Sequence, residues 1–496
     1  MSTSGDGPEA WLVERSIAGL QELMGSGERS AVDITSAYLE RIEALDGPYR
    51  SVVETNPDAV AIASSLDQER AAGSVRGPLH GIPILLKENI DTGDSMLTTA
   101  GSLALMDSTT AGDAFVVSQL RAAGAVILGK LGMSEWAFFR SEHGSSGWSG
   151  RNGQVGNAFD PMRTPGGSSS GSGVAASLNF AAATIGTETD GSIVSPANAN
   201  GVVGLKPTVG LTSRHGVIPI SASQDTIGPL ARTVADAAAV LTAMAGTDAA
   251  DPATGGAPQV DYSAHLDADG LRSARLGIMR TSFPGSPKTK IEFERAVELM
   301  RRAGAEIVEV DGLPSPADVG KHELPVLLHE FKAGLEEYLA TRSEGSPRTL
   351  AEIIDFNRRH ADDELVHFGQ DVLEAAELTT GLEAPAYLDA LQQGQSLARS
   401  GIDDALDRLG LDALIAPTGG PAPMIDLVHG ERRVGGSSTL AAVAGYPIVS
   451  VPSGVIAGLP VNVSFIGTAW SESTLIKLAS GFEAARGPRA VPQRGR

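Results

Sequence analysis

The spacing of apolar residues predicts helices and strands in alternation along most of the chain. Apolar side chains recur at helical spacing near the N-terminus, which predicts a helix over residues 9–24. Ser30 and Asp33 have the spacing of a capping sequence and predict the start of a second helix, which extends to Leu45. A third helix is predicted over residues 57–72. Short apolar runs and helical patterns then alternate, which is typical of an α/β core.

The other predicted elements follow this alternation. In the first half we expect strands over residues 82–86, 125–130 and 181–185, and helices over residues 114–123, 172–178 and 234–244. Residues 245–270, rich in Gly, Ala, Asp and Pro, predict a crossing on the surface. Beyond it we expect a βαβ unit (275–279, 291–303, 305–310), helices over about 322–406, strands at 414–418, 448–451 and 461–465, and a last helix over 472–485.

The glycine- and serine-rich stretch over residues 163–208 is the strongest candidate for a site. Glycine costs backbone entropy wherever the chain is held, so such turns indicate close approach of the backbone to a ligand. Residues 167–171 match the Gly-x-Ser-x-Gly pattern of a nucleophile elbow centred on Ser169. However, Pro161 and Pro165 stand where an elbow requires a strand. The glycines lack the spacing of phosphate-binding loops, and a flexible linker fits poorly between strongly patterned elements.

Composition and charge narrow the possible functions. The 496 residues are 42% hydrophobic and 20% charged, as in ordinary globular proteins. The net charge of −22 disfavours direct binding to nucleic acid or to anionic membranes. Without cysteine there is no disulfide, thiolate metal site or cysteine nucleophile, and we expect no metal and no organic cofactor. The N-terminus lacks a signal-peptide pattern and no transmembrane run occurs, so we expect a cytoplasmic protein.

Five motifs, in this order, resemble the amidase signature family of serine hydrolases. They are Gly81–Asn89, Gly129–Trp136, Pro165–Ser172, Gly186–Ile193 and Gly201–Thr208. The resemblance covers about residues 30–245 and resumes at residues 458–461 and 465–467. It implies an α/β fold with one large domain, in which helices cover both faces of a mixed, twisted β-sheet.

The expected organisation is a leader and helix over residues 1–29, an amidase domain over 30–485 and a C-terminal tail over 486–496. Within the amidase domain, the signature core spans about residues 80–245. A helical cover on the substrate side spans about residues 320–410.

The resemblance also assigns roles to individual residues. It implies that Ser192 is the nucleophile, Ser168 the bridging serine after a cis peptide bond, and Lys87 the base. It further implies an oxyanion hole formed by Thr189, Asp190, Gly191 and Ser192. The residues expected to contact the substrate are Asp190, Gly166 and Gly167.

The chemistry of these side chains supports the same assignment. A serine hydroxyl needs a base to act as a nucleophile, and no histidine lies within the motifs. An unperturbed lysine has a pKa near 10.4, and burial beside Leu85 and Leu86 would lower it by about three units. A neutral Lys87 would then take a proton from Ser168, which takes one from Ser192. On an exposed surface, Lys87 would be an ordinary lysine.

Asp190 stands where many family members have a second glycine. Residues 185–196, 134–137 and 219–226 are most similar to bacterial peptide amidases, which convert a C-terminal peptide amide to a carboxylate and ammonia. We weigh two roles for Asp190: it braces the turn, or it orients the amide nitrogen of the substrate.

Two other functions are kept open. One is a broad hydrolase of small amides, aryl amides, carbamates or esters. The other, from a different class, is the glutaminase subunit of a tRNA-dependent amidotransferase. In the preferred interpretation the partner is a small-molecule or peptide amide substrate, and the protein is a monomer or a homodimer.

Overall fold

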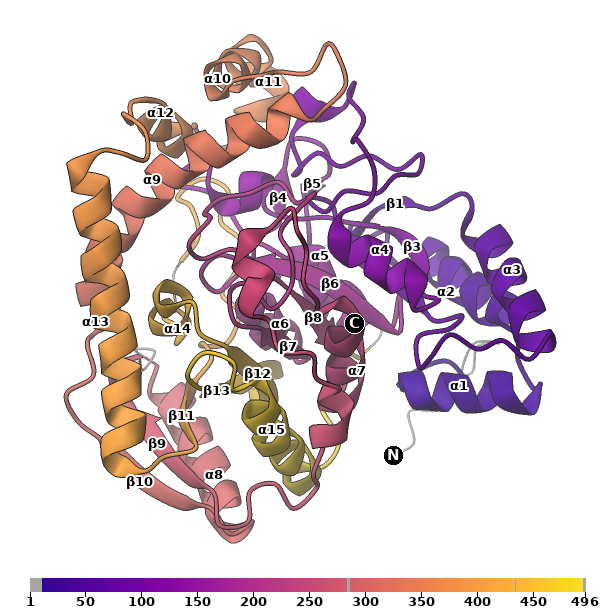
Figure 1. Cartoon of the computed structure of the whole chain (residues 1–496), viewed down its shortest axis with the longest axis vertical. Helices are drawn as coiled ribbons and strands as arrows, with labels where there is room; N and C mark the ends of the chain where they lie inside the picture. The colour runs from indigo at the N-terminus through magenta and orange to yellow at the C-terminus, as the bar shows by residue number, and fades with distance from the viewer. Residues whose placement is uncertain (1–10, 283–285, 433, 494–496) are drawn as a thin grey trace.

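The centre of the computed structural model is one mixed β-sheet of eleven strands, seen in Figure 1. The structure describes residues 11–282, 286–432 and 434–493. From one edge to the other, the strands are β1 (Val52–Thr55), β3 (Val126–Leu131), β2 (Pro83–Lys87), β6 (Ala183–Glu188), β8 (Thr226–Ala231), β7 (Val203–Lys206), β12 (Ile448–Ile456), β13 (Leu459–Ile466), β11 (Ala413–Pro417), β9 (Arg275–Met279) and β10 (Glu306–Val310). A separate two-stranded ribbon consists of β4 (Trp148–Ser149) and β5 (Gly153–Gln154).

Two regions of parallel pairing lie on either side of an antiparallel centre, and the edge strand β1 is antiparallel to β3. Strand β2 runs parallel to both β3 and β6, and β9 runs parallel to β10 and β11. The strands from β6 through β8, β7, β12 and β13 to β11 pair in antiparallel fashion. The predicted βαβ unit is confirmed, because α8 (Pro287–Arg302) connects the parallel strands β9 and β10.

Helices cover both faces of the sheet, as expected. Alternate side chains of β11 show this: Ile415 joins the large core cluster with α7, α8 and α15, while Leu414 joins a second cluster with α13 and α14. The α-helices besides α8 are α1 (Ile17–Ser26), α2 (Ala31–Leu45), α3 (Ala59–Ala71), α4 (Phe115–Ala122), α5 (Ser170–Ser177), α6 (Val194–Asn200), α7 (Val234–Met244), α9 (Pro316–Ala340), α10 (Leu350–Arg359), α11 (Ala361–Glu364), α12 (Asp371–Glu377), α13 (Pro385–Leu409), α14 (Thr439–Ala444) and α15 (Glu472–Arg486).

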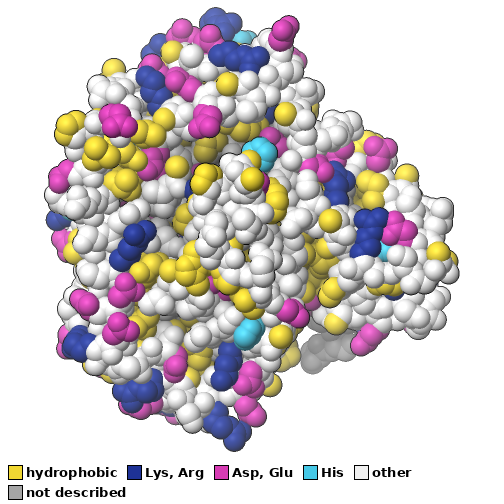
Figure 2. Space-filling view, viewed as in Figure 1, with side chains coloured by type: hydrophobic (Ala, Val, Ile, Leu, Met, Phe, Trp, Pro, Cys, Tyr) yellow, Lys and Arg dark blue, Asp and Glu magenta, His cyan; other side chains and the backbone are white. Residues whose placement is uncertain are grey.

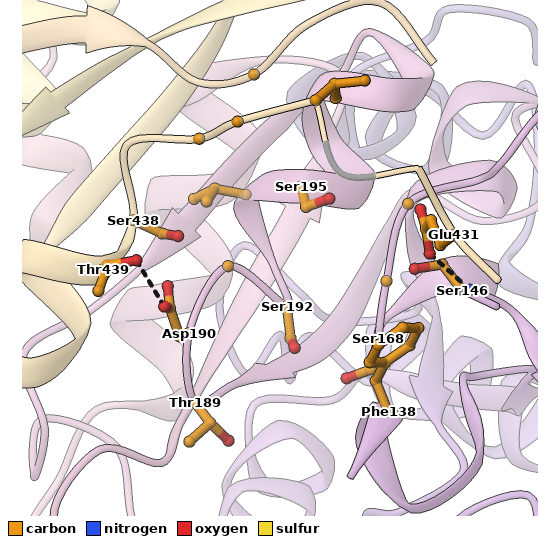
Figure 3. Close-up of a pocket in the computed structure, with 18 of the residues that line it drawn as sticks. Phe138, Ser146, Ser168, Thr189, Asp190, Ser192, Ser195, Glu431, Ser438 and Thr439 are labelled. Carbon is orange, nitrogen blue, oxygen red and sulfur yellow. Dashed lines mark hydrogen bonds between the residues drawn. The ribbon is translucent and has the colours of Figure 1, made fainter. Parts of the chain in front are cut away.

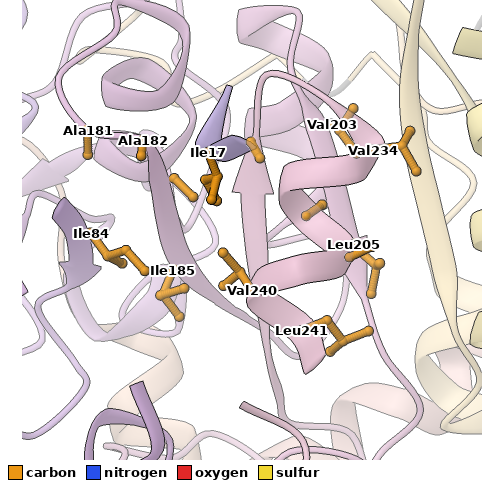
Figure 4. Packing of buried hydrophobic residues seen from close by; sticks show 14 of the residues in the cluster. Ile17, Ile84, Ala181, Ala182, Ile185, Val203, Leu205, Val234, Val240 and Leu241 are labelled. Carbon is orange, nitrogen blue, oxygen red and sulfur yellow. The ribbon is translucent and has the colours of Figure 1, made fainter. Parts of the chain in front are cut away.

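The large core cluster forms where α7 packs on the sheet. Figure 4 shows Val240 and Leu241 of α7 beside Ile185 of β6 and Leu205 of β7. All four side chains are fully buried. These four side chains are all aliphatic, so this contact rests on close packing of branched side chains.

Helices α9 to α13 lie at the left and top of Figure 1. The helices predicted over residues 322–406 are therefore confirmed. Hydrophobic side chains gather on the surface in the region of α9 and α13 in Figure 2, where Leu324 and Leu388 are 40% and 47% exposed. Elsewhere on this face acidic and basic side chains are interspersed.

Several elements differ from the predictions for local physical reasons. The first helix begins at Ile17 rather than at residue 9, because Ser16 caps it; Glu9 and Ala10 lie outside the described residues. Strand β8 is not predicted by the pattern, since it contains Gly228 and Pro229. The structure requires glycine at position 228, because a Cβ there would lie 2.0 Å from the Leu205 carbonyl oxygen. The short strands β1 and β7 and the short helix α6 are also absent from the predictions.

The two ends of the described chain meet. Arg489 follows α15 and is 8% exposed; its guanidinium binds the Glu14 carboxylate and donates to the carbonyl oxygens of Ser177 and Gly201.

Residues 245–270 form loops and two 3₁₀ turns, as a surface crossing should, although Tyr262 within them is buried. Within the described ranges, no helix is both long and apolar enough to cross a lipid bilayer.

Phe465 provides a test of the core. It is fully buried on β13 with its ring centroid 5.9 Å from that of Phe482 on α15. Phe465→Ala should lower the free energy of unfolding by about 3–5 kcal/mol, because it removes the ring and leaves a cavity. Leu378→Ala, at a side chain 83% exposed, should change it by about 0.5 kcal/mol or less. Urea denaturation followed by circular dichroism measures both; equal effects would contradict this packing.

Candidate active site

Lys87 lies at the carboxyl end of β2, a strand whose five residues are all buried. Because β3 and β6 run parallel to β2, their carboxyl ends share one edge of the sheet, where α/β proteins place their sites. Thr187, near the end of β6, therefore lies beside Lys87. The Lys87 side chain has no exposure to solvent.

Three oxygen atoms surround the amine of Lys87. Its Nζ donates to Ser168 Oγ at 2.7 Å, to Thr187 Oγ1 at 2.8 Å and to the Thr187 carbonyl oxygen at 3.3 Å. An ammonium group uses its three protons on these contacts. A neutral amine would keep the two to Thr187 and accept a proton from Ser168, so the same geometry serves both protonation states.

Burial lowers the pKa of Lys87 from its ordinary value to about 7. Loss of water disfavours the charged amine, and the nearby carboxylates of Asp225 and Glu188 partly oppose this by favouring it. Two other lysines, Lys130 and Lys206, are fully buried with pKa values lowered to about 8, but each donates to backbone carbonyl oxygens. Lys87 is the one that contacts the serine motif.

Ser168 follows a cis peptide bond from Gly167, as the resemblance implies. The turn that carries it is held from two sides. The Ser134 backbone N–H donates to the Ser168 carbonyl oxygen at 3.1 Å. On the other side, Thr164 Oγ1 accepts from the Gly166 N–H at 3.2 Å and donates to the Glu431 carboxylate at 2.8 Å.

Ser192 lies on the loop between β6 and α6. The buried Glu188 closes this loop, since its carboxylate accepts from the backbone N–H groups of Ile193 at 2.7 Å and Val194 at 3.0 Å. Gly191 has a φ of 82°, a left-handed conformation that favours glycine. In Figure 3 the hydroxyls of Ser192 and Ser168 point toward the same space in the pocket.

The same loop offers backbone donors beside Ser192. Within the part of the chain that the structure describes, the N–H groups of Gly191 and Ser192 donate to no protein acceptor. Two neighbouring donors at the wall of a pocket can bind the oxygen of a tetrahedral intermediate. The turn Thr189–Ser192 thus has the form expected of an oxyanion hole.

Asp190 contacts a residue far away in the sequence. Its Oδ2 accepts from Thr439 Oγ1 at 2.8 Å, as Figure 3 shows, and the residue also lines the pocket. This contact joins the turn to the start of α14. It agrees with the bracing role considered for Asp190.

Thr189, at the start of the turn, is held by two residues that the sequence did not assign to the site. Its Oγ1 donates to Asp225 Oδ1 at 2.6 Å, and its carbonyl oxygen accepts from Gln224 Nε2 at 3.3 Å. Both residues lie in the run 219–226, whose resemblance to peptide amidases suggests no role for them. Burial raises the pKa of the Asp225 carboxyl.

These groups meet at a pocket of about 740 Å³. The pocket includes every predicted site residue except Lys87, which lies behind Ser168. Other residues of the wall come from the segment 137–146, from α9 and α12, and from the segment 418–439. The apolar part of the wall consists of Ala137, Phe138, Phe139, Val194, Ala199, Ile220, Pro316, Ala317, Leu324, Leu327, Val372, Ala422, Pro423 and Val434.

Ser169 does not have the role of an elbow nucleophile. Its side chain is fully buried; its hydroxyl donates to the Thr187 carbonyl oxygen at 3.0 Å and accepts from the Thr187 N–H. The segment before it is a loop, as the two prolines indicated. In the described residues, no three His, Asp or Glu side chains are grouped so as to hold a metal ion.

The fold and this site together define an amide C–N hydrolase of the amidase signature family. Residues 33–476 match the family model described as Amidase, so the chain belongs to that family. The structure of native peptide amidase from Stenotrophomonas maltophilia is 50% identical and has a TM-score of 0.92, covering 98% of this chain and 99% of that one.

Two sequence relatives extend the comparison. A probable amidase of Arabidopsis thaliana is 40% identical over 494 residues, which cover 97% of this chain and 91% of the relative. A glutamyl-tRNA(Gln) amidotransferase subunit of Salinispora tropica is 34% identical, covering 97% of this chain and 99% of the relative. The likeness is therefore greater to the peptide amidase than to the amidotransferase.

The charges around Lys87 predict a specific pH dependence. If neutral Lys87 is the base, kcat/KM should rise with pH through a midpoint of about 7. Asp225→Asn should move this midpoint to lower pH, because it removes a negative charge that favours the ammonium form. Asp355→Asn, on the exposed face of α10, is the control and should leave the midpoint unchanged. An unchanged midpoint in Asp225→Asn would contradict the assignment of Lys87 as the titrating base.

Proposed function

We propose that the protein removes the C-terminal amide of peptides, giving a free carboxylate and ammonia, through a Ser192–Ser168–Lys87 triad. The observation that carries the proposal is the contact between the buried Lys87 amine and Ser168 Oγ at 2.7 Å, with both serine hydroxyls facing one pocket. An amine with a pKa near 7 is suited to proton transfer at neutral pH.

In the first half of the reaction, neutral Lys87 takes the proton of Ser168 as Ser168 takes that of Ser192. The Ser192 oxygen attacks the amide carbonyl and a tetrahedral intermediate forms. Its negative oxygen is bound by the backbone N–H groups at Gly191 and Ser192. The proton returns through Ser168 to the amide nitrogen, the C–N bond breaks, and ammonia leaves the acyl-enzyme.

In the second half, water replaces ammonia. It gives a proton to the same relay and attacks the acyl carbon, and the ester bond to Ser192 breaks with return of that proton to Oγ. Each step returns the triad to its starting protonation. The chain supplies all the groups that the reaction needs, so no cofactor enters the scheme.

The choice of a peptide amide rests on likeness and on the pocket. The neighbour at 50% identity over nearly the whole chain is named as a peptide amidase. A cavity of about 740 Å³ with an extensive apolar wall suits the side chains of a short peptide better than a single small amide. We propose that Asp190, with Gly166 and Gly167, contacts the substrate, with the Asp190 carboxylate facing the amide nitrogen.

The test is the mass of the product together with an ammonia assay after incubation with an N-protected dipeptide amide. We expect a gain of about one dalton and one ammonia for each peptide, since OH replaces NH₂. If the peptide is unchanged while a small aryl amide or carbamate is cleaved, the proposed substrate is wrong but the triad remains supported. Activity only with a co-purifying partner protein would instead favour the glutaminase function.

Substitutions test the triad separately from the substrate. Ser192→Ala should abolish turnover, because it removes the attacking hydroxyl. Lys87→Ala should lower kcat at neutral pH by about 10³-fold or more, because it removes the base. Circular dichroism and thermal unfolding check that each variant folds. A Lys87→Ala enzyme with nearly wild-type kcat at pH 7 would show that another group is the base.

A further inference from the structure

Helix α9 of the helical cover contacts the start of the oxyanion turn through a buried polar network. The network runs through residues 220–225, called here the clamp segment, which lies between α9 and Thr189. One of its residues, Ile220, lines the pocket, so the segment is also part of the pocket wall. The mechanism above uses none of the groups that connect α9 to this segment.

Glu330 of α9 is the anchor of the network. It is 4% exposed, and its Oε2 accepts from Ser221 Oγ at 2.5 Å, from the Ser223 N–H at 2.9 Å and from Ser223 Oγ at 3.0 Å. Its Oε1 accepts from the Tyr387 hydroxyl of α13 at 2.8 Å. One buried carboxylate thus joins α9, α13 and the clamp segment, and all its bonds are charge-assisted if it is ionised.

From the clamp segment the network reaches the Thr189 side chain through Asp225. Asp225 Oδ2 accepts from the backbone N–H groups of Ile220 at 2.7 Å and Ser221 at 2.9 Å, which closes the segment into a compact turn. Its other oxygen, Oδ1, accepts from Thr189 Oγ1. Asp225 therefore transmits the position of the segment to Thr189.

Gln224 reaches the backbone of the same residue. Its Nε2 donates to the Thr189 carbonyl oxygen and also to Glu323 Oε1 of α9 at 2.8 Å. A peptide unit is planar, so fixing the direction of the Thr189 carbonyl also fixes the direction of the Asp190 N–H at its other end. This peptide begins the turn whose next two N–H groups, those of Gly191 and Ser192, are the donors beside the nucleophile.

We propose that Gln224 and Glu330 are positioning residues for the hydrolysis, which hold the Thr189–Asp190 peptide at the angle that the oxyanion hole requires. Neither residue lines the pocket, and Gln224 is 2% exposed, so their effect reaches the reaction through Thr189. The inference rests on the proposed function, because it assumes that the turn binds the oxyanion. It assigns to the helical cover a role in catalysis besides that of a wall.

This arrangement should act on the transition state more than on substrate binding. Donors to an oxyanion contribute when the negative charge develops, and losing one costs about 10²–10³-fold in kcat. A turn that is misaligned but retained should lose less. Gln224→Met keeps the size of the side chain and removes both hydrogen bonds. Glu330→Gln keeps the shape, but it leaves one acceptor oxygen in place of two and removes the negative charge.

The test measures kcat, KM and the Ki of a peptide aldehyde, whose hemiacetal with Ser192 places its oxygen in the same hole. For Gln224→Met we expect kcat to fall about tenfold or more, KM to stay within about twofold, and the aldehyde Ki to rise in proportion to the loss in kcat. Glu330→Gln should change the same quantities in the same direction. If these residues had a role in stability alone, the substitutions would lower the melting temperature without weakening the binding of the aldehyde.

Glu377→Gln is the matched control. Glu377, the last residue of α12, also bonds α9, through Lys332 at 3.0 Å, but does not touch the clamp segment. The kcat and aldehyde Ki of this variant should equal those of the wild type. Wild-type values in both Gln224→Met and Glu330→Gln, or an equal loss in Glu377→Gln, would overturn the proposal. If Glu330→Gln does not fold, Gln224→Met decides alone.

The wild-type enzyme, assayed in parallel, separates the two proposals. No turnover of the dipeptide amide by the wild type would contradict the proposed substrate, and the same three variants would then be compared on an aryl amide. Wild-type turnover with unaffected variants would contradict the positioning role only.

Discussion

The exclusion of water from the Lys87 amine is the condition on which the rest of the site depends. A lysine exposed to water stays charged at neutral pH and cannot accept a proton. Here β2 ends between two parallel neighbours, and the apolar residues before Lys87 leave its amine with Ser168 and Thr187 as partners. The carboxylates of Asp225 and Glu188 limit how far the pKa falls. The result is an amine whose pKa lies near neutrality through the balance of desolvation and charge.

Three carboxylates also determine the shape of the loop that carries Ser192. Glu188 closes the end of the loop beyond Ser192, and Asp225 holds its beginning at Thr189. Asp190 ties the middle to Thr439. Each carboxylate comes from or reaches a different part of the chain, so the turn is fixed at three points before any substrate binds. Backbone donors held in this way would need little reorganisation when negative charge develops on a bound carbonyl oxygen, as the proposed function requires.

The sequence motifs predict the main residues of the candidate site, but other residues of the site carry no signal in the sequence. Lys87, Ser168 and Ser192 can be identified because each lies in a motif of unusual composition. The structure brings the two serines to one pocket and places Lys87 behind Ser168. Thr187 lies within a motif but has no chemical signal of its own. Glu330 and Glu431 give no signal at all, since a glutamate within an amphipathic helix or a polar loop has the pattern of a solvated side chain. Their roles arise only where buried donors surround them.

The sequence by itself determined the class of the fold, most of the long helices and strands, and which residues are the candidates for catalysis. These depend on local periodicity and on short motifs, which are properties of neighbouring residues. Only the tertiary structure decided that β8, with its glycine and proline, joins the sheet, that Asp190 meets Thr439 of α14, and that α9 reaches Thr189 through Gln224 and Glu330. Such contacts join residues about 30 to 250 positions apart, and they form because burial leaves each polar group no other partner.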